Sequence, residues 1–158
     1  MIDIHNFDFL IGKWNVLNRR LNERLADCDE WTEFTAEMET NPILNGLGIM
    51  DEMKSAHFGD NFIGLSIRIL NPVSHEWKIF WADTANPEIG LKKQVVGKFE
   101  NGVGKFFGKE DYKGKEYNLR FFWKKETADT AQWEQAYYNE ANQVWETNWT
   151  MLFTSIKN

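Results

Sequence analysis

The chain of 158 residues contains only one cysteine, three prolines and three histidines. Because Cys28 has no second cysteine to pair with, an intramolecular disulfide is excluded. The carboxylates beside Cys28 disfavour a thiolate and predict an unreactive loop cysteine. The sequence also lacks a charged and apolar leader and any apolar run of membrane-spanning length. We therefore expect a cytoplasmic protein that does not contact a membrane.

The chain is also short of positive charge, with 18 basic against 24 acidic residues and a formal charge of −6. Nucleic-acid binders usually need a concentrated basic surface, and the small lysine clusters here each lie beside carboxylates. We therefore expect no nucleic-acid partner. His5, His57 and His75 are scattered without a metal-ligand spacing, so no metal site is expected either.

Signatures of familiar catalytic sites are missing as well. No serine lies in a G-x-S-x-G elbow of the kind that positions a hydrolase nucleophile. The glycines of Gly102-Val103-Gly104 follow Asn101 and join two strand-like segments, which predicts a hairpin turn rather than a phosphate-binding loop. The sequence thus offers no recognisable catalytic set.

Aromatic residues are abundant, with 8 Trp, 12 Phe and 4 Tyr, and such side chains suit the pleated wall of a β-barrel. Turn signals such as Asn101-Gly102 and Asn71-Pro72 recur along the chain. One helical turn is expected within residues 7–11, and a bend or short helical turn within 42–46. Strands are expected over residues 13–24, 31–39, 47–57, 63–70, 77–82, 95–100, 104–112, 116–125, 132–138 and 145–156.

About ten strands joined by short loops predict an all-β fold, namely a single antiparallel up-and-down β-barrel with a short N-terminal helical turn. Closure into a barrel removes the exposed edges that an open sheet of this size would leave. A β-sandwich is the second interpretation. We expect one domain over residues 1–158, with an interior that is either packed or hollow.

Alternation along the later strands predicts which side chains face the barrel interior. Every second residue from Tyr117 to Trp123 is apolar, and the series from Trp145 to Phe153 is similar. These two sets are expected to point inward. The same alternation places four polar residues on the outer wall, where cross-strand pairing would satisfy them: Arg120, Glu134, Glu146 and Asn148.

Alternation in two earlier strands places polar residues on opposite sides of the wall. In the expected strand 63–70, the isoleucines and leucine of one face form the apolar set, which predicts that Ser66 and Arg68 point outward unless that apolar face packs elsewhere. In the expected strand 13–24 the opposite holds: if Trp14 points inward, the alternation predicts that Asn18 and Arg20 point inward as well. A charge inside a barrel needs a partner, water or a ligand, so Arg20 becomes a candidate binding residue.

Gly12-Lys13-Trp14, at the start of the first expected strand, resembles the G-x-W signature of lipocalins and other calycins. The chain further resembles an uncharacterised, mostly bacterial family of calycin-like domains. This resemblance implies a lipocalin- or nitrobindin-like barrel. Nitrobindin-like relatives bind haem through a histidine late in the chain, but no histidine follows His75 here, so no cofactor is expected. The matching segments are 7–14 (FDFLIGKW), 18–21 (NRRL), 44–48 (LNGLG), 77–83 (WKIFWAD), 102–108 (GVGKFFG), 133–136 (WEQA) and 145–151 (WETNWTM).

Our first hypothesis is therefore a non-catalytic barrel that binds a small, partly apolar ligand in its cavity. Aromatic rings would bury the body of the ligand, and a few polar groups would orient its acidic or carbonyl end. The candidate ligand-binding residues are Trp14, Arg20, Glu52, Trp81, Asp83, Gln135, Tyr137 and Trp149.

Two other hypotheses belong to different functional classes. The chain could be an isomerase, cyclase or lyase in which Asp83 or Glu52 acts as the base and Tyr137 donates a proton. Alternatively, it could be a structural or interaction module with a filled core that forms a homodimer through a barrel face.

Overall fold

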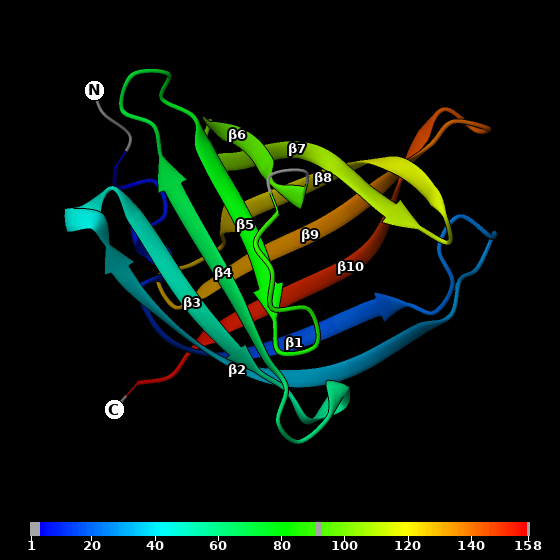
Figure 1. The fold of residues 1–158 in the computed structure, drawn as a ribbon. Helices are drawn as coiled ribbons and strands as arrows, with labels where there is room; N and C mark the ends of the chain where they lie inside the picture. The colour runs from blue at the N-terminus through cyan, green and yellow to red at the C-terminus, as the bar shows by residue number, and fades with distance from the viewer. Residues whose placement is uncertain (1–3, 91–92, 158) are drawn as a thin grey trace.

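The computed structural model describes residues 4–90 and 93–157, which form one closed barrel of antiparallel strands (Figure 1). The order around the barrel is β1-β10-β9-β8-β7-β6-β5-β4-β3-β2, so that each strand pairs with its neighbours in sequence and β1 closes against β10. This result confirms the predicted up-and-down barrel. The strands are β1 Gly12–Leu21, β2 Trp31–Ile43, β3 Gly48–Lys54, β4 Ile63–Leu70, β5 Trp77–Asp83, β6 Val95–Glu100, β7 Val103–Tyr112, β8 Lys115–Lys125, β9 Thr130–Asn139 and β10 Val144–Ser155.

Three short 3-10 helices interrupt the strands within the described residues: η1 Asp8–Leu10, η2 Leu44–Gly46 and η3 Ala56–Phe58. Helix η1 is the helical turn expected near the N-terminus, and η2 lies within the bend expected at 42–46. Strand β2 continues to Ile43, past the expected end at residue 39. No helix among the described residues has both the length and the hydrophobicity that crossing a membrane requires.

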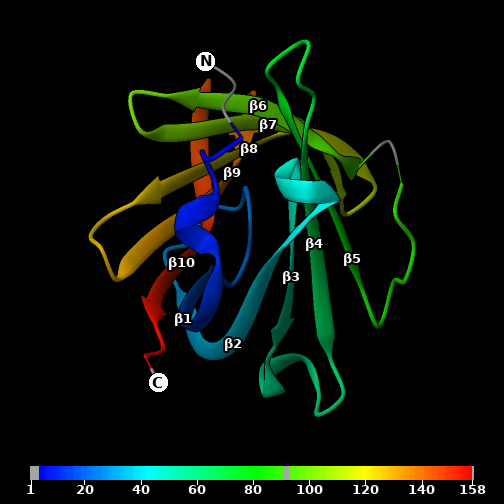
Figure 2. The same ribbon diagram turned by 90° about the vertical axis from the view of Figure 1, so that its left-hand side faces the viewer.

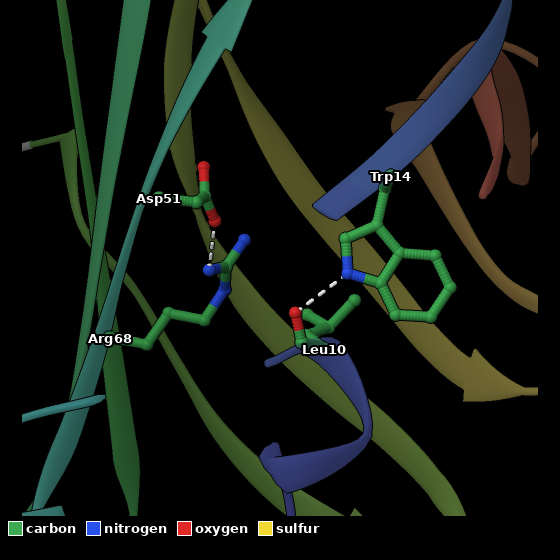
Figure 3. A network of polar contacts seen from close by, with 4 residues as sticks. All are labelled: Leu10, Trp14, Asp51 and Arg68. Atoms are coloured by element: carbon green, nitrogen blue, oxygen red, sulfur yellow. Dashed lines mark hydrogen bonds and ion pairs between the residues drawn. The ribbon is translucent and has the colours of Figure 1, made fainter. Parts of the chain in front are cut away.

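The segment before β1 closes one end of the barrel, which we call the plugged end (Figure 2). The ring of Phe7 is 0% exposed and lies 4.9–6.0 Å from four other aromatic rings, measured between ring centres. The indole Nε1 of Trp14 donates a 2.8 Å hydrogen bond to the carbonyl oxygen of Leu10, which ties η1 to β1 (Figure 3). The four rings that surround Phe7 belong to Trp77, Phe99, Phe106 and Trp123.

Strand β4 presents the opposite face to the one that its apolar alternation predicts. Ser66 and Arg68 are buried inside, whereas the isoleucines and leucine of the other face are only half-buried on the outer wall. The prediction that Ser66 and Arg68 point outward is therefore wrong. Its physical reason is that β-branched side chains suit either face of a pleated sheet, while the interior supplies a carboxylate, Asp51, that compensates Arg68.

A β-bulge changes the alternation in β10. The register against β9 shifts between Thr147 and Trp149, so Asn148 is an extra residue in the strand. Trp149 and the apolar residues after it keep the predicted inward face. On the other side of the bulge, Trp145 packs on the outer wall against Tyr138, contrary to the prediction, and Asn148 is buried rather than placed outside.

Candidate functional site

The barrel encloses a cavity of about 290 Å³ between its walls. Its lining is mainly apolar and aromatic, and includes Trp81, Phe121, Trp123, Trp133, Trp149 and Met151. Four buried polar side chains also line the cavity: Asp51, Ser66, Arg68 and Gln135. Five further polar residues of the lining are half-buried or exposed: Asp83, Asn86, Glu88, Lys93 and Glu110. A hollow with an apolar lining and few polar groups is the usual form of a site for a small organic molecule.

The principal polar feature of the cavity is an ion pair between Asp51 on β3 and Arg68 on β4. The Nη1 of Arg68 donates to Oδ2 of Asp51, and both side chains are almost completely buried (Figure 3). Burial raises the pKa of the Asp51 carboxyl, and the neighbouring guanidinium opposes that rise. Among the described residues, the second carboxylate oxygen of Asp51 and the Nε of Arg68 have no hydrogen-bond partner, so each can form a further hydrogen bond beside the cavity.

A second group of polar contacts fixes the wall formed by β9 and β10. Nε2 of Gln135 donates a 2.8 Å hydrogen bond to Oδ1 of Asn148, the residue of the bulge. The indole of the next residue, Trp149, donates from Nε1 to Oδ1 of Asn18 on β1 at 2.9 Å. The bulge therefore places an amide pair and an indole in fixed positions on the cavity wall.

The end of the barrel opposite the plug, which we call the open end, carries a second and more polar hollow of about 480 Å³. Here Nη1 of Arg24 donates a 2.5 Å hydrogen bond to the hydroxyl of Tyr137. That hydroxyl in turn donates to Oε2 of Glu110 at 2.6 Å. Burial and then the Glu110 carboxylate raise the pKa of Tyr137 above its ordinary value near 10, so the hydroxyl stays protonated at neutral pH.

Arg20 lies at the border between the two hollows. Its guanidinium carbon is 4.6 Å from the centre of the Trp149 ring and 5.6 Å from the centre of the Phe58 ring. Burial, and next the nearby Arg24, lower the pKa of Arg20. Because Trp149 lines the cavity while Arg20 lines the second hollow, this stacked pair connects them.

The structure brings together six of the eight candidate residues at these two hollows. Trp81, Asp83, Gln135 and Trp149 line the cavity. The other two, Arg20 and Tyr137, line the hollow at the open end.

Two candidates lie elsewhere. Trp14 packs in the core near the plugged end, and Glu52 is exposed on the outer wall. Asp83, although it lies at the cavity, has both carboxylate oxygens engaged. Its Oδ2 accepts from Trp81 Nε1, and its Oδ1 accepts from the backbone N–H groups of Ala85 and Asn86.

Several polar residues of the two hollows were not among the candidates. The buried ones at the cavity are Asp51, Ser66 and Arg68, and those at the open end include Arg24 and Glu110. Asp51 had a usable signal, because it alternates with two residues of apolar character, Ile49 and Met53, that face the same side. Arg24 has the same alternation as Trp14 and Arg20 within the expected strand 13–24, but β1 ends at Leu21, so strand alternation does not determine the position of Arg24.

Comparisons with known proteins support the fold. The sequence matches no family model, and no curated protein matches it. Among solved structures, the S-type phycobiliprotein lyase CPES from Guillardia theta is similar, with a TM-score of 0.64 and 11% identity over 100% of this chain and 94% of that chain. Rv2717c from M. tuberculosis is similar with a TM-score of 0.61 and 10% identity, over 98% of this chain and 97% of its own. The chain therefore has a calycin-like barrel fold.

Proposed function

We propose that this protein binds a small, partly apolar organic molecule inside its barrel. The observation that carries the proposal is the cavity of about 290 Å³, lined by aromatic rings and by buried polar atoms that lack partners. This volume lies just below the range of about 300–1,000 Å³ that is usual for small-molecule sites. A ligand of about two aromatic rings fits this size better than a long lipid.

The polar atoms of the cavity support a ligand with a hydrogen-bonding group. A buried donor or acceptor without a partner costs about 1–3 kcal/mol. The free oxygen of Asp51 accepts a hydrogen bond, and Nε of Arg68 donates one, so a ligand with an adjacent donor and acceptor would relieve both. The opposite charges of the pair compensate each other, which favours a neutral group at this depth.

We propose binding without assigning a catalytic residue. The carboxylate of Asp83 is engaged by its own loop and by Trp81, and Glu52 lies outside the barrel. One structural neighbour is a lyase, but an identity of 11% extends to the fold and not to the chemistry.

A fluorescence titration with N-phenyl-1-naphthylamine tests the proposal, because this neutral dye emits strongly only in an apolar site. The variant Ser66→Phe places a ring in the cavity, whereas Ile67→Phe adds a similar ring on the outer face of the same strand. We expect Ser66→Phe to weaken binding at least about ten-fold and Ile67→Phe to leave it nearly unchanged. Equal affinities in the two variants would place the dye outside the cavity and contradict the proposal.

Native mass spectrometry of freshly purified protein complements the titration. A bound organic molecule should appear as a stoichiometric adduct, and its mass after denaturation would identify the natural ligand. The adduct should be absent from Ser66→Phe and present in Ile67→Phe. An adduct retained by both variants would count against the cavity.

A further inference from the structure

Two guanidinium groups meet at the open end of the barrel, in a hollow that two carboxylate residues, Glu110 and Asp111, also line. Arg20 lies on the inward face of β1, and Arg24 lies in the segment between β1 and β2. Both line the polar hollow of about 480 Å³, and burial, followed by the charge of Arg24, lowers the pKa of Arg20. Like charges that a fold holds side by side, partly out of water, favour binding of an anion.

The carboxylates of this region are engaged by other donors. Glu110 accepts a hydrogen bond from the hydroxyl of Tyr137, and Glu146 accepts a 2.6 Å hydrogen bond from the backbone N–H of Leu25. Asp111 also lines the hollow, but it is exposed to water and, among the described residues, forms no ion pair with either arginine. Among the described residues, no carboxylate oxygen lies within 4.0 Å of a nitrogen of Arg20, unlike its neighbour Arg19, which pairs with Glu33.

The guanidinium of Arg20 is held in place by aromatic rings rather than by hydrogen bonds. It lies over the rings of Trp149 and Phe58. Cation–π stacking uses the flat face of a guanidinium and leaves its in-plane N–H donors free. A positioned guanidinium with free donors suits a carboxylate or phosphate, which it can bind through two parallel hydrogen bonds.

We propose that Arg20 and Arg24 form an oxyanion site at the open end of the barrel, so that the ligand is an amphipathic organic acid. Its apolar part occupies the cavity, and its carboxylate or phosphate meets the two guanidinium groups. The ring of Trp149 lines the cavity and stacks against Arg20, so it connects the cavity with the oxyanion site. This inference rests on the proposed function, because it names the class of molecule that the same barrel binds.

Displacement of N-phenyl-1-naphthylamine by three matched competitors tests the oxyanion site. The competitors are 1-naphthylacetate, its neutral amide 1-naphthylacetamide, and 1-naphthyl phosphate. In the wild-type protein we expect one or both anions to compete about ten-fold more strongly than the amide. Stronger competition by 1-naphthylacetate would identify the ligand as a carboxylic acid, and stronger competition by 1-naphthyl phosphate would identify it as a phosphate ester.

Two variants distinguish a local site from the overall charge of the protein. Arg20→Gln should remove the advantage of the anions over the amide. Arg19→Gln removes the same charge from the adjacent, outward position and should keep that advantage. Arg20→Lys, which retains a charge but not the planar fork, should retain only part of it, and this variant also serves if Arg20→Gln does not fold.

The outcomes separate this inference from the proposed function. If the dye does not enter the wild-type cavity, the proposed ligand binding is contradicted, and so is the proposal that the ligand is an organic acid. If the dye binds but the acid, the phosphate and the amide compete equally, only the oxyanion site is overturned. An equal loss of preference in Arg19→Gln and Arg20→Gln would also overturn it, because the effect would then come from long-range charge.

Discussion

The two ends of this barrel are built from the same kinds of aromatic side chains, but they use them differently. At the plugged end, the rings around Phe7 contact one another and exclude water. At the open end, rings such as Trp149 and Tyr137 also contact other rings, but in addition they lie against Arg20 and Arg24, which line the polar hollow. We infer that the plugged end mainly stabilises the barrel and that the open end mainly serves recognition.

The ion pair of Asp51 and Arg68 lies at the border between these two functions. The guanidinium carbon of Arg68 is 5.4 Å from the centre of the Phe7 ring and 4.8 Å from the centre of the Trp123 ring. Arg68 and its partner Asp51 also line the cavity. A substitution in the plugged end should therefore alter the cavity through Arg68, whereas a substitution at the open end should leave the packing of the plugged end unchanged.

The largest effect is expected from Phe7→Ala. Removing a completely buried phenyl ring loses its contacts with the surrounding rings and leaves a cavity, which costs about 3–5 kcal/mol of unfolding free energy. Phe107→Ala is the matched control, because Phe107 is 50% exposed on the outer wall. Urea denaturation measures both. If the two variants lose equal stability, the segment before β1 is not a stabilising plug.

A somewhat smaller loss, about 3 kcal/mol, is expected from Arg68→Met, because it leaves the Asp51 carboxylate buried without its partner. The double variant Asp51→Leu with Arg68→Met should recover most of that loss. Burial raises the pKa of Asp51 in the folded state. The stability that the Asp51 carboxyl contributes is therefore fully present below its unfolded-state pKa and is lost as pH rises through its folded-state pKa. The defect of Arg68→Met should therefore be smaller at about pH 5 than at about pH 8, which urea denaturation at both pH values measures.

Much of the fold could be predicted from the sequence because strand alternation and turn residues are local signals. Asn101-Gly102 has positive φ at both positions, as the predicted hairpin between β6 and β7 requires. The face of β4 could not be predicted in this way. Gly64 lies under Trp81, and a Cβ there would come within 2.3 Å of the indole, a constraint that only the packed barrel reveals.

The site was predictable only where it followed a regular strand. On β1, the alternation from Trp14 correctly predicts that Asn18 and Arg20 point inward. The bulge at Asn148 interrupts the alternation in β10, because one extra residue means that the inward face of Trp149 and the residues after it does not extend to Trp145 before it. Arg24 and Tyr137 meet across more than a hundred residues of sequence, and no local pattern reports such a contact.

The smallest effect is expected at the open end, from Tyr137→Phe. This change removes the hydroxyl that accepts from Arg24 and donates to Glu110, and we expect a loss of about 1–2 kcal/mol near neutral pH. Tyr138→Phe is the matched control, because Tyr138 lies beside Trp145 on the outer wall. A loss as large as that of Phe7→Ala would show that the open end also stabilises the barrel, and would remove the contrast between the two ends.

The pH dependence of the same variant sharpens the test. The folded-state pKa of Tyr137 is raised above the unfolded value near 10 by burial and by Glu110. The stabilisation from this group is therefore fully present below the unfolded pKa and is lost as pH rises through the folded pKa. Phenylalanine has no proton to lose, so the stability difference between wild type and Tyr137→Phe should narrow above about pH 10. Urea denaturation in alkaline buffers, with Tyr138→Phe in parallel, measures this difference; a constant difference would mean that the hydroxyl of Tyr137 is as accessible to water as that of an ordinary surface tyrosine.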